Sequence, residues 1–431
     1  MRISALTLFP ALYEPFVRTS LVARAIDSEI VSISVEDLFS FVGPKKRIDS
    51  PSFGHGSGML LRPEVIEQAI TAQEHKYGPS YKIFFSPQGK KLDQEMLSKL
   101  ASILHEKKHL MLIPARYEGM DARVEQEYAD CVLSIGDYVL MGGDLPAMVF
   151  MEGVLRLIPG VIGKEDSVRE ESFSGAFVDY PEYTAPITWR GHEVPEIVRS
   201  GNHEALRDWR KNEAAKTSVI NHFQWVRSHI SDREDKRRAA QFIPSHYVIL
   251  MHDQVLVDTD REGTSSLTSL DIHDIARSAT TYGIKNYFIV TPLVDQQRIA
   301  QKLLTFWQTE VGIEYNPQRH KALASVKLVS SLDEALAQIN QIEASEPLLL
   351  GTSAKESTGI PRLTYSDQEK VWSCSRPIAI VLGTARGLAP SVLNRCDYLL
   401  GPIEGFSEYN HLSVRSAAAV ILDRWLGINL V

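Results

Sequence analysis

Short apolar runs of strand length alternate with longer amphipathic stretches, and this alternation constrains the fold more than any other feature of the sequence. In the first part of the chain, apolar runs lie at residues 2–9, 31–35, 82–85 and 109–113, and helical patterns lie at 63–75 and 92–107. Strands that alternate with helices favour a mostly parallel sheet covered by helices on both faces. The fold class predicted for this part is therefore α/β.

The same alternation restarts after residue 242. Apolar runs then lie at residues 247–251, 287–290, 348–350 and 378–382, with a helical pattern at 272–282. The preceding segment, residues 231–241, is charged throughout and has no apolar stripe, so it is predicted to be a linker. A chain of 431 residues is long enough for two such domains. We therefore expect two α/β domains that meet near residue 242.

A faint internal repeat relates the two halves. In each half a buried strand runs into a loop that ends in glycine, at residues 114–119 and 383–387. An isoleucine follows sixteen residues after the last glycine of each loop, at Ile135 and Ile403. The spacing indicates that one fold is used twice.

Charge and cysteine content narrow the function classes. The net charge is -8, so contact with a polynucleotide requires a local basic patch. Residues 199–238 carry ten Arg or Lys side chains against six acidic ones, which fits either such a patch or a solvated helix face. Three cysteines without paired spacing and the lack of an eighteen-residue apolar run predict a cytoplasmic protein without a membrane span.

Three loops are candidates for chemistry. Residues 53–59 hold three glycines at alternate positions but lack a Walker ending, and they fit a ligand loop or a flexible one. Residues 116–123 place four charged side chains directly after a buried strand. This arrangement fits either a ligand site or a structural Arg–Glu pair. Residues 135–146 are apolar but broken by glycines, which suits an adenine and a ribose and offers no phosphate cradle. A nucleoside-type cofactor is favoured, and the thirteen scattered histidines predict no metal site.

Several motifs occur in the order found in one bacterial enzyme family. They lie at residues 86–94, 116–119, 134–140, 142–148, 158–161 and 200–203. Here the sequence closely resembles the tRNA (guanine-N1)-methyltransferases of the trefoil-knotted SPOUT superfamily. The resemblance implies a knotted, parallel-sheet domain at residues 1–165 and a helical tRNA-binding extension at 166–242.

The resemblance also assigns the first site. The implied S-adenosylmethionine pocket comprises Pro87, Ala115, Tyr117, Glu118, Ile135, Gly136, Asp137, Tyr138, Val139, Leu140, Gly142, Gly143 and Pro146. Arg156 would lie beside the target base. Glu171 stands where the family has its catalytic Asp, and Asp166 and Asp179 are alternative bases. Ala115 is a second departure, because the family usually has Gly there.

The implied reaction is methyl transfer to N1 of the guanosine 3′ to the anticodon, position 37 of tRNA. A carboxylate would remove the N1 proton, and Arg156 would stabilise the negative charge on O6. The family also implies a homodimer with shared active sites, and Mg²⁺ is a further candidate cofactor. The alternative is a non-catalytic tRNA-binding or assembly protein that keeps the knot, which the Glu at position 171 favours.

Residues 243–431 resemble a second SPOUT group, a bacterial family of proposed RNA methyltransferases. The matching motifs lie at residues 270–277, 282–283, 380–388 and 410–417. The implied cofactor and catalytic candidates are Arg277, Leu382, Gly383, Gly387, Ile403, Leu412 and Ser413. Asp271 and His273 replace the Asn and Gly that usually precede the catalytic Arg, so ribose methylation is disfavoured. The part is expected to bind S-adenosylmethionine by itself, with a degenerate RNA-binding or cofactor-binding module as the alternative.

Overall fold

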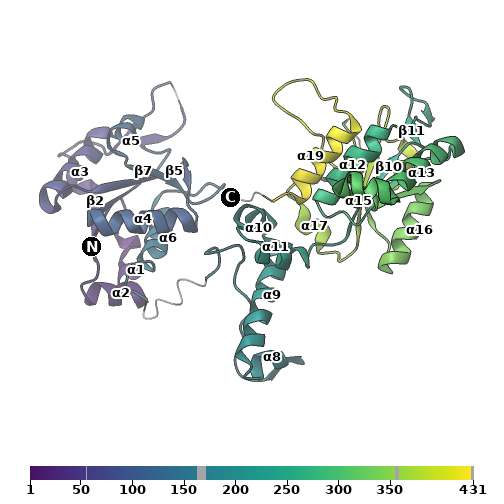
Figure 1. Cartoon of the computed structure of the whole chain (residues 1–431). Coiled ribbons are helices and arrows are strands. Elements are labelled where there is room, and N and C mark those ends of the chain that lie inside the picture. The colour runs from purple at the N-terminus through teal and green to yellow at the C-terminus, as the bar shows by residue number, and fades with distance from the viewer. Residues whose placement is uncertain (55, 163–170, 355–358, 429–431) are drawn as a thin grey trace. The chain divides into compact units, whose positions relative to one another are not determined.

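The computed structural model describes residues 1–54, 56–162, 171–354 and 359–428. Contacts within the chain divide it into two compact units, Met1–Ser174 and Gly175–Val431 (Figure 1). Each unit contains a parallel β-sheet with helices packed on it, which confirms the predicted α/β class. The trefoil knot stays a prediction.

The first unit is built on a five-stranded parallel sheet with the order β2-β1-β6-β5-β7. Its strands are β1 (Arg2–Thr7), β2 (Ser32–Asp37), β5 (Tyr81–Lys91), β6 (His109–Pro114) and β7 (Cys131–Ser134), and β3 (Asp49–Pro51) and β4 (Met59–Leu61) form a separate antiparallel pair. Its helices are η1 (Pro10–Leu12), α1 (Glu14–Val17), α2 (Ser20–Asp27), η2 (Leu38–Phe41), α3 (Pro63–Tyr77), α4 (Gln94–Lys107), α5 (Ala122–Tyr128) and α6 (Asp144–Leu155).

Strand β6 shows why this sheet is covered on both faces. All six of its residues are buried. Leu110 and Leu112 belong to the core cluster under α2, α4 and α6, whereas Met111 and Ile113 belong to the cluster under α3 and α5. Because successive side chains of a strand point to opposite faces, an unbroken apolar strand needs helices on both sides.

The second unit has a seven-stranded parallel sheet with the order β14-β13-β10-β17-β15-β18-β16. These strands are β10 (His246–Met251), β13 (Asn286–Val290), β14 (Val326–Val329), β15 (Leu348–Thr352), β16 (Arg362–Leu363), β17 (Ile378–Gly383) and β18 (Tyr398–Leu400). The short pairs are β8 (Thr188–Trp189) with β9 (His192–Glu193) and β11 (Val255–Leu256) with β12 (Glu262–Gly263). The helices are α8 (Glu196–Arg199), α9 (His203–Asn221), α10 (Phe223–His229), α11 (Arg233–Ala240), α12 (Ser269–Thr281), α13 (Val294–Gln308), α14 (Glu310–Tyr315), α15 (Pro317–Leu323), α16 (Leu332–Glu343), α17 (Gln368–Trp372), α18 (Pro390–Leu393) and α19 (Val414–Leu426).

The two sheets confirm the internal repeat. The order β2-β1-β6-β5-β7 recurs as β13-β10-β17-β15-β18, and the second unit adds one strand at each edge. The loops after β6 and β17 also share their backbone shape. Tyr117 and Gly119 have φ of 60° and 123°, and Ala385 and Gly387 have φ of 53° and 105°. One supersecondary arrangement therefore occurs twice in the chain.

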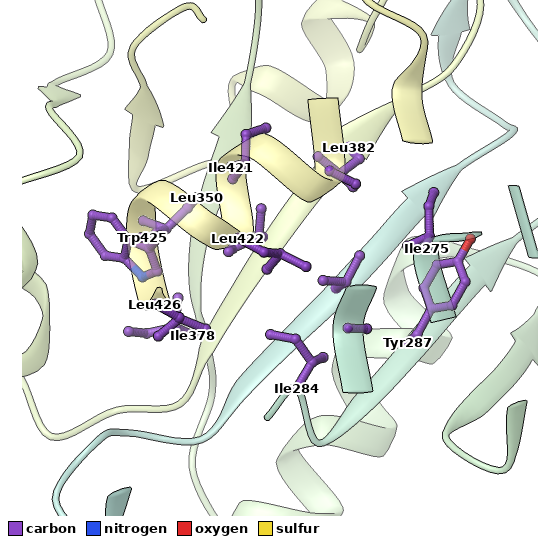
Figure 2. Close-up of a cluster of buried hydrophobic side chains, with 14 of the residues drawn as sticks. Ile275, Ile284, Tyr287, Leu350, Ile378, Leu382, Ile421, Leu422, Trp425 and Leu426 are labelled. Carbon is purple, nitrogen blue, oxygen red and sulfur yellow. The ribbon is translucent and has the colours of Figure 1, made fainter. Parts of the chain in front are cut away.

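The helical extension shares a core with the second sheet. Apolar residues of α9, α10 and α11 belong to the same buried cluster as residues of β10, β15, β17 and α19. Phe223 packs edge-on against Trp372 with ring centroids 4.6 Å apart, and Arg227 donates hydrogen bonds to the carbonyl oxygens of Asp423 and Arg424. Figure 2 shows the part of this cluster in which α19 covers the sheet, with Ile421, Leu422, Trp425 and Leu426 near Leu350, Ile378 and Leu382.

The prediction of a linker at residues 231–241 is wrong. Residues 233–240 form helix α11, which begins after the Asp232 side chain accepts a hydrogen bond from the Asp235 backbone amide. Arg238 then joins α11 to α9 through Asn212 and Asp208. Capping and ion pairs stabilise this helix, so an apolar stripe is not needed.

Asp144 joins four separate segments in the interior of the first unit. Its side chain is buried and lies at the first residue of α6, where the helix end favours negative charge. It accepts hydrogen bonds from the Thr7 hydroxyl at 2.5 Å, the Tyr13 hydroxyl at 3.0 Å and Arg116 Nε at 2.6 Å. Burial and the Asp144 charge raise the pKa of Tyr13 well above its usual value, so this phenol stays a donor.

Replacing Asp144 by Ala should destabilise the first unit by about 3–5 kcal/mol, because Arg116 would lose its buried partner. Native-state hydrogen exchange of amides in β1 and β6 measures this free energy. Asp137→Ala is the matched control: its pair with Lys91 is mostly exposed, and its removal should cost less than about 1 kcal/mol. Equal effects of the two substitutions would contradict the structural role given to Asp144.

His246 lies buried beneath α19 as a neutral ring. Trp425 Nε1 donates to its Nε2 at 3.0 Å, and its Nδ1 lies 2.6 Å from the Pro244 carbonyl oxygen, to which it must donate. Both ring nitrogens are thus used by the neutral form with its proton on Nδ1. Burial lowers the pKa of His246 to about 4.

Because the unfolded chain binds this proton near pH 6.5, the second unit should lose stability as the pH falls from about 6.5 towards 4. At pH 4.5 the loss from His246 alone amounts to about 2–3 kcal/mol. His246→Gln keeps an acceptor for Trp425 but cannot titrate. Thermal unfolding of both chains across this pH range should show a weaker acid sensitivity in the variant, and equal sensitivities would contradict the assignment.

Candidate functional site

The predicted cofactor loops of the first unit meet at the carboxyl ends of β5, β6 and β7. The Gly143 amide donates to the Ala115 carbonyl oxygen at 2.7 Å, and Arg116 bridges to Gly142. A Cβ on Gly143 would lie 2.8 Å from the Ala115 backbone nitrogen, so only glycine permits this approach of two backbones. The structure thus brings the predicted residues of the 115–118 and 142–146 segments together.

Residues 135–141 follow β7 and are the next segment predicted to bind the cofactor. The side chains of Tyr138, Val139 and Met141 are exposed by 56%, 84% and 91%. Asp137 is also at the surface, where it pairs with Lys91. Exposed apolar side chains on a loop can pack against an adenine ring. They can equally pack against the surface of another protein.

The remaining predicted cofactor residues occupy the edges of the same region. Pro87 is exposed near the end of β5, and Pro146 is buried in the first turn of α6. The glycine-rich segment before β4 reaches Glu118, because a Cβ on Gly58 would lie 2.4 Å from Glu118 Cγ. The loops at residues 53–59 and 116–123, which were separate candidates in the sequence, therefore lie next to each other.

Arg156 and Glu171 form an ion pair at the far end of α6. Arg156 Nη2 lies 2.6 Å from Glu171 Oε1, and the two side chains are 37% and 21% exposed. The Glu171 carbonyl oxygen accepts hydrogen bonds from the amide and hydroxyl of Ser174, which fixes the local turn. A cation and a carboxylate are thereby held side by side and remain open to solvent.

The sequence also offered Asp166 and Asp179 as alternative bases. Asp166 lies outside the described residues. Asp179 is exposed and belongs to the second unit. Among the described carboxylates, Glu171 is the one found next to Arg156.

The basic stretch at residues 199–238 divides into structural and exposed side chains. Arg227 and Arg238 are half-buried and bind backbone carbonyls or acidic partners, and Arg210 stacks on Tyr180. The exposed basic side chains are Arg199, Arg207, Lys211, Lys216, Arg233, Lys236 and Arg237. Enough positive charge remains at the surface for a contact with phosphates.

The second unit contains a pocket of about 1000 Å³ at the carboxyl ends of its central strands. We call it the second pocket. Of the predicted second-domain residues, its lining includes Leu382, Gly383, Gly387, Ile403, Leu412 and Ser413. A Cβ on Gly383 would lie 2.4 Å from the Leu388 backbone nitrogen, so this glycine allows the loop to fold back.

Arg277 is the predicted residue that the second pocket leaves out. It is exposed on α12 and is absent from the pocket lining. Arg415 and Asp271 line the pocket instead, and sequence reasoning assigned neither a role. One feature of the sequence could have indicated Arg415. It lies two residues after Ser413, which caps α19, and therefore in the turn that faces the cofactor loop.

A buried hydrogen-bond chain supports the floor of the second pocket. Thr384 donates to the Met251 carbonyl oxygen, so Ser265 must donate to Thr384, and His252 Nδ1 must donate to Ser265. His252 Nε2 is then an acceptor, and no partner is found for it among the described residues. Burial lowers the pKa of His252 to about 4, in keeping with a neutral ring.

Metal and membrane features are absent from the parts of the chain that the structure describes. There, no group of three or more His, Cys, Asp or Glu side chains is arranged to hold a metal ion. Over the same residues, every helix is too short or too polar to cross a bilayer.

Comparison with known proteins matches two parts of the chain to two families of methyltransferases. The family model of tRNA (guanine-1)-methyltransferase TrmD matches residues 1–227, and that of a SAM-dependent RNA methyltransferase matches residues 245–427. A solved tRNA (m1G37) methyltransferase from Aquifex aeolicus is 32% identical, covers 48% of this chain and 87% of its own, and has a TM-score of 0.42.

Curated relatives match over one or both parts. Proteins named tRNA (guanine-N(1)-)-methyltransferase from Oleidesulfovibrio alaskensis and Nitratidesulfovibrio vulgaris are 37% and 36% identical, over 99% of this chain and of their own lengths. One of the same name from Thermus thermophilus is 41% identical over 51% of this chain and 89% of its own. The chain therefore belongs to the tRNA (guanine-1)-methyltransferase family, with a second part that matches SAM-dependent RNA methyltransferases.

Proposed function

We propose that the first unit, together with the helical extension, transfers a methyl group from S-adenosylmethionine to N1 of the guanosine 3′ to the anticodon of tRNA, position 37. The observation that carries this proposal is the Arg156–Glu171 pair at 2.6 Å in a member of this family. The Watson–Crick edge of guanine presents the O6 acceptor beside the N1–H donor. A guanidinium beside a carboxylate is the complement of that edge.

The chemistry follows from this arrangement. Glu171 accepts the N1 proton as general base, and Arg156 stabilises the negative charge that develops on O6. The sulfonium of S-adenosylmethionine supplies an electrophilic methyl group. Since the donor is already activated, these residues contribute mainly alignment and proton removal. Glu is one methylene longer than the Asp usual in the family, and its pairing with Arg156 keeps the carboxylate at the end of α6.

The cofactor would be held by the loops that meet beside β6 and β7. Backbone groups of residues 135–140 and of Ala115 would bind the adenosine, and Glu118 would face the methionine end. Tyr117, Gly142, Gly143 and Pro146 would shape the pocket. Mg²⁺ remains a candidate cofactor. The described residues offer no ligand cluster for it, and no step is assigned to it.

The helical extension would bind tRNA through its exposed arginines and lysines. We also propose a cytoplasmic homodimer whose active sites are shared between subunits. The exposed Val139, Met141, Leu145 and Val149 support this part, because they place apolar side chains next to the candidate pocket.

The alternative is a tRNA-binding or assembly protein without catalysis. It rested on the replacement of the family Asp by Glu171. That argument is weakened by the ion pair, because the longer side chain still reaches Arg156. Methyl transfer is therefore the better account of this site.

Glu171→Gln should lower the rate of methyl transfer to unmodified tRNA about 10²–10⁴-fold, because the amide cannot accept the N1 proton. Binding of S-adenosylhomocysteine, measured by calorimetry, should be unchanged. Glu152→Gln is the matched control on the exposed side of α6 and should leave the rate within twofold. If Glu171→Gln keeps more than half of the activity, Glu171 is not the base.

The second unit is proposed to bind S-adenosylmethionine in the second pocket. The repeat of the β6 loop after β17 supports this, as does the match to a SAM-dependent family. The expected fragment boundary was residue 243, but the helical extension shares the core of this unit. The full chain is therefore the right material for a test.

Calorimetric titration of the full chain with S-adenosylhomocysteine should show binding to both units. Gly383→Leu should abolish the site in the second unit, because its side chain would collide with the backbone of Gly387 and Leu388. Gly405→Leu, at a position with open space around its Cβ, should leave both sites intact. Binding that is confined to the first unit of the parent chain would refute the proposal.

A further inference from the structure

The second pocket and the first site have loops of the same backbone shape, but the charged side chains on these loops differ. Glu118 and Arg386 occupy the same position in the two loops, because each directly precedes the last glycine of its loop, Gly119 or Gly387. The charge at this position is therefore reversed. Arg386 lines the second pocket, and its side chain is 58% exposed.

Arg415 is the second cation of this pocket. It lies in the first turn of α19 and faces two acidic residues of α12. Its Nη1 is 3.7 Å from Asp271 Oδ1, and its Nε is 3.8 Å from Asp274 Oδ2. Both separations exceed the length of a hydrogen bond. The two carboxylates thus hold the guanidinium by charge without using its N–H groups.

Asp271 is suited to position Arg415. Its side chain is 8% exposed, and its other oxygen accepts a hydrogen bond from the Thr268 hydroxyl at 2.6 Å. A buried carboxylate that is anchored on one side fixes the place of a nearby cation. Arg386 is also loosely paired, with Asp258 at 3.9 Å and Thr259 at 3.4 Å. Two arginines with unused donors therefore line one pocket.

We propose that Arg415, positioned by Asp271, and Arg386 bind the phosphodiester backbone of an RNA methyl acceptor in the second pocket. Planar guanidinium groups with free N–H donors match phosphate oxygens, and several cations are needed to hold a polynucleotide. The exposed Arg277, predicted from the sequence, takes no part. This inference rests on the proposed cofactor site of the second unit.

The test uses the full chain carrying Glu171→Gln, which silences the first site. Bulk tRNA and ribosomal RNA from cells that lack this chain are incubated with methyl-labelled S-adenosylmethionine. Label should enter one of the two RNA pools. Adding Arg415→Ala should lower kcat/KM for that RNA about tenfold or more, mainly through KM, whereas Arg277→Ala should stay within twofold. Arg415→Lys keeps the charge but loses the planar guanidinium with its paired N–H donors. Its kcat/KM should fall between those of the other two variants.

Two further readouts separate a contact with RNA from a structural role. Loss of one phosphate contact should reduce the slope of log KM against log salt by about one, which a merely misfolded pocket would not do. Asp271→Asn should raise KM for RNA and leave kcat nearly unchanged. Binding of S-adenosylhomocysteine to the second unit should be unaffected by Arg415→Ala.

Three results would overturn the inference. They are no labelling of either RNA pool, an equal effect of Arg277→Ala, and a loss of S-adenosylhomocysteine affinity that matches the loss for RNA. The last result would assign Arg415 to the carboxylate of the cofactor. Failure of the cofactor proposal itself would be seen separately, as the lack of a second binding site in the parent chain. Failure in the first unit would be seen as the lack of 1-methylguanosine.

Discussion

The buried Asp144 carboxylate connects the parts of the first unit on which the candidate site depends. It binds the end of β1 through Thr7, the turn after η1 through Tyr13, and the loop after β6 through Arg116. A buried charge must be fully hydrogen-bonded, so these segments can take few other positions. The same residue opens α6, which carries Arg156 at its other end. One interaction therefore orients both the loop after β6 and the helix that leads to Arg156.

The second unit repeats the topology but supports its pocket differently. Its equivalent loop is held by Thr384, Ser265 and His252 in a neutral hydrogen-bond chain, whereas Arg116 and Asp144 form an ion pair. The strand order and the glycine positions are common to both units. The backbone of the pocket is thus the repeated feature, and the polar side chains around it have diverged. This divergence is what separates the substrates proposed for the two sites.

Much of the fold could be predicted because the central strands β6 and β10 are fully buried. Runs such as His109–Pro114 and His246–Met251 are apolar on both faces, which is the pattern of a parallel sheet. Helix α11 could not be predicted from hydrophobicity, since caps and ion pairs stabilise it. The packing of α10 against α17 and α19 was also hidden, because Phe223 and Trp372 are distant in sequence.

The residues of the candidate sites could be predicted only in part. Gly143 and Gly383 were named from the motifs that carry the family resemblance, and the structure shows a close approach of backbones at both. Arg415 was missed because its role depends on Asp271, which lies on another helix far away in the sequence. Arg277 was chosen from a motif alone, and the helix turns it to the surface.

The central claim is that the first unit methylates N1 of a single guanosine in tRNA. The direct measurement is mass spectrometry of nucleosides and mapped fragments from unmodified tRNA transcripts incubated with the full chain and S-adenosylmethionine. The account predicts 1-methylguanosine at position 37 of a transcript with guanosine there, and none in a transcript with adenosine at that position. Methylation at another guanosine, or no 1-methylguanosine from an active, cofactor-binding chain, would contradict it.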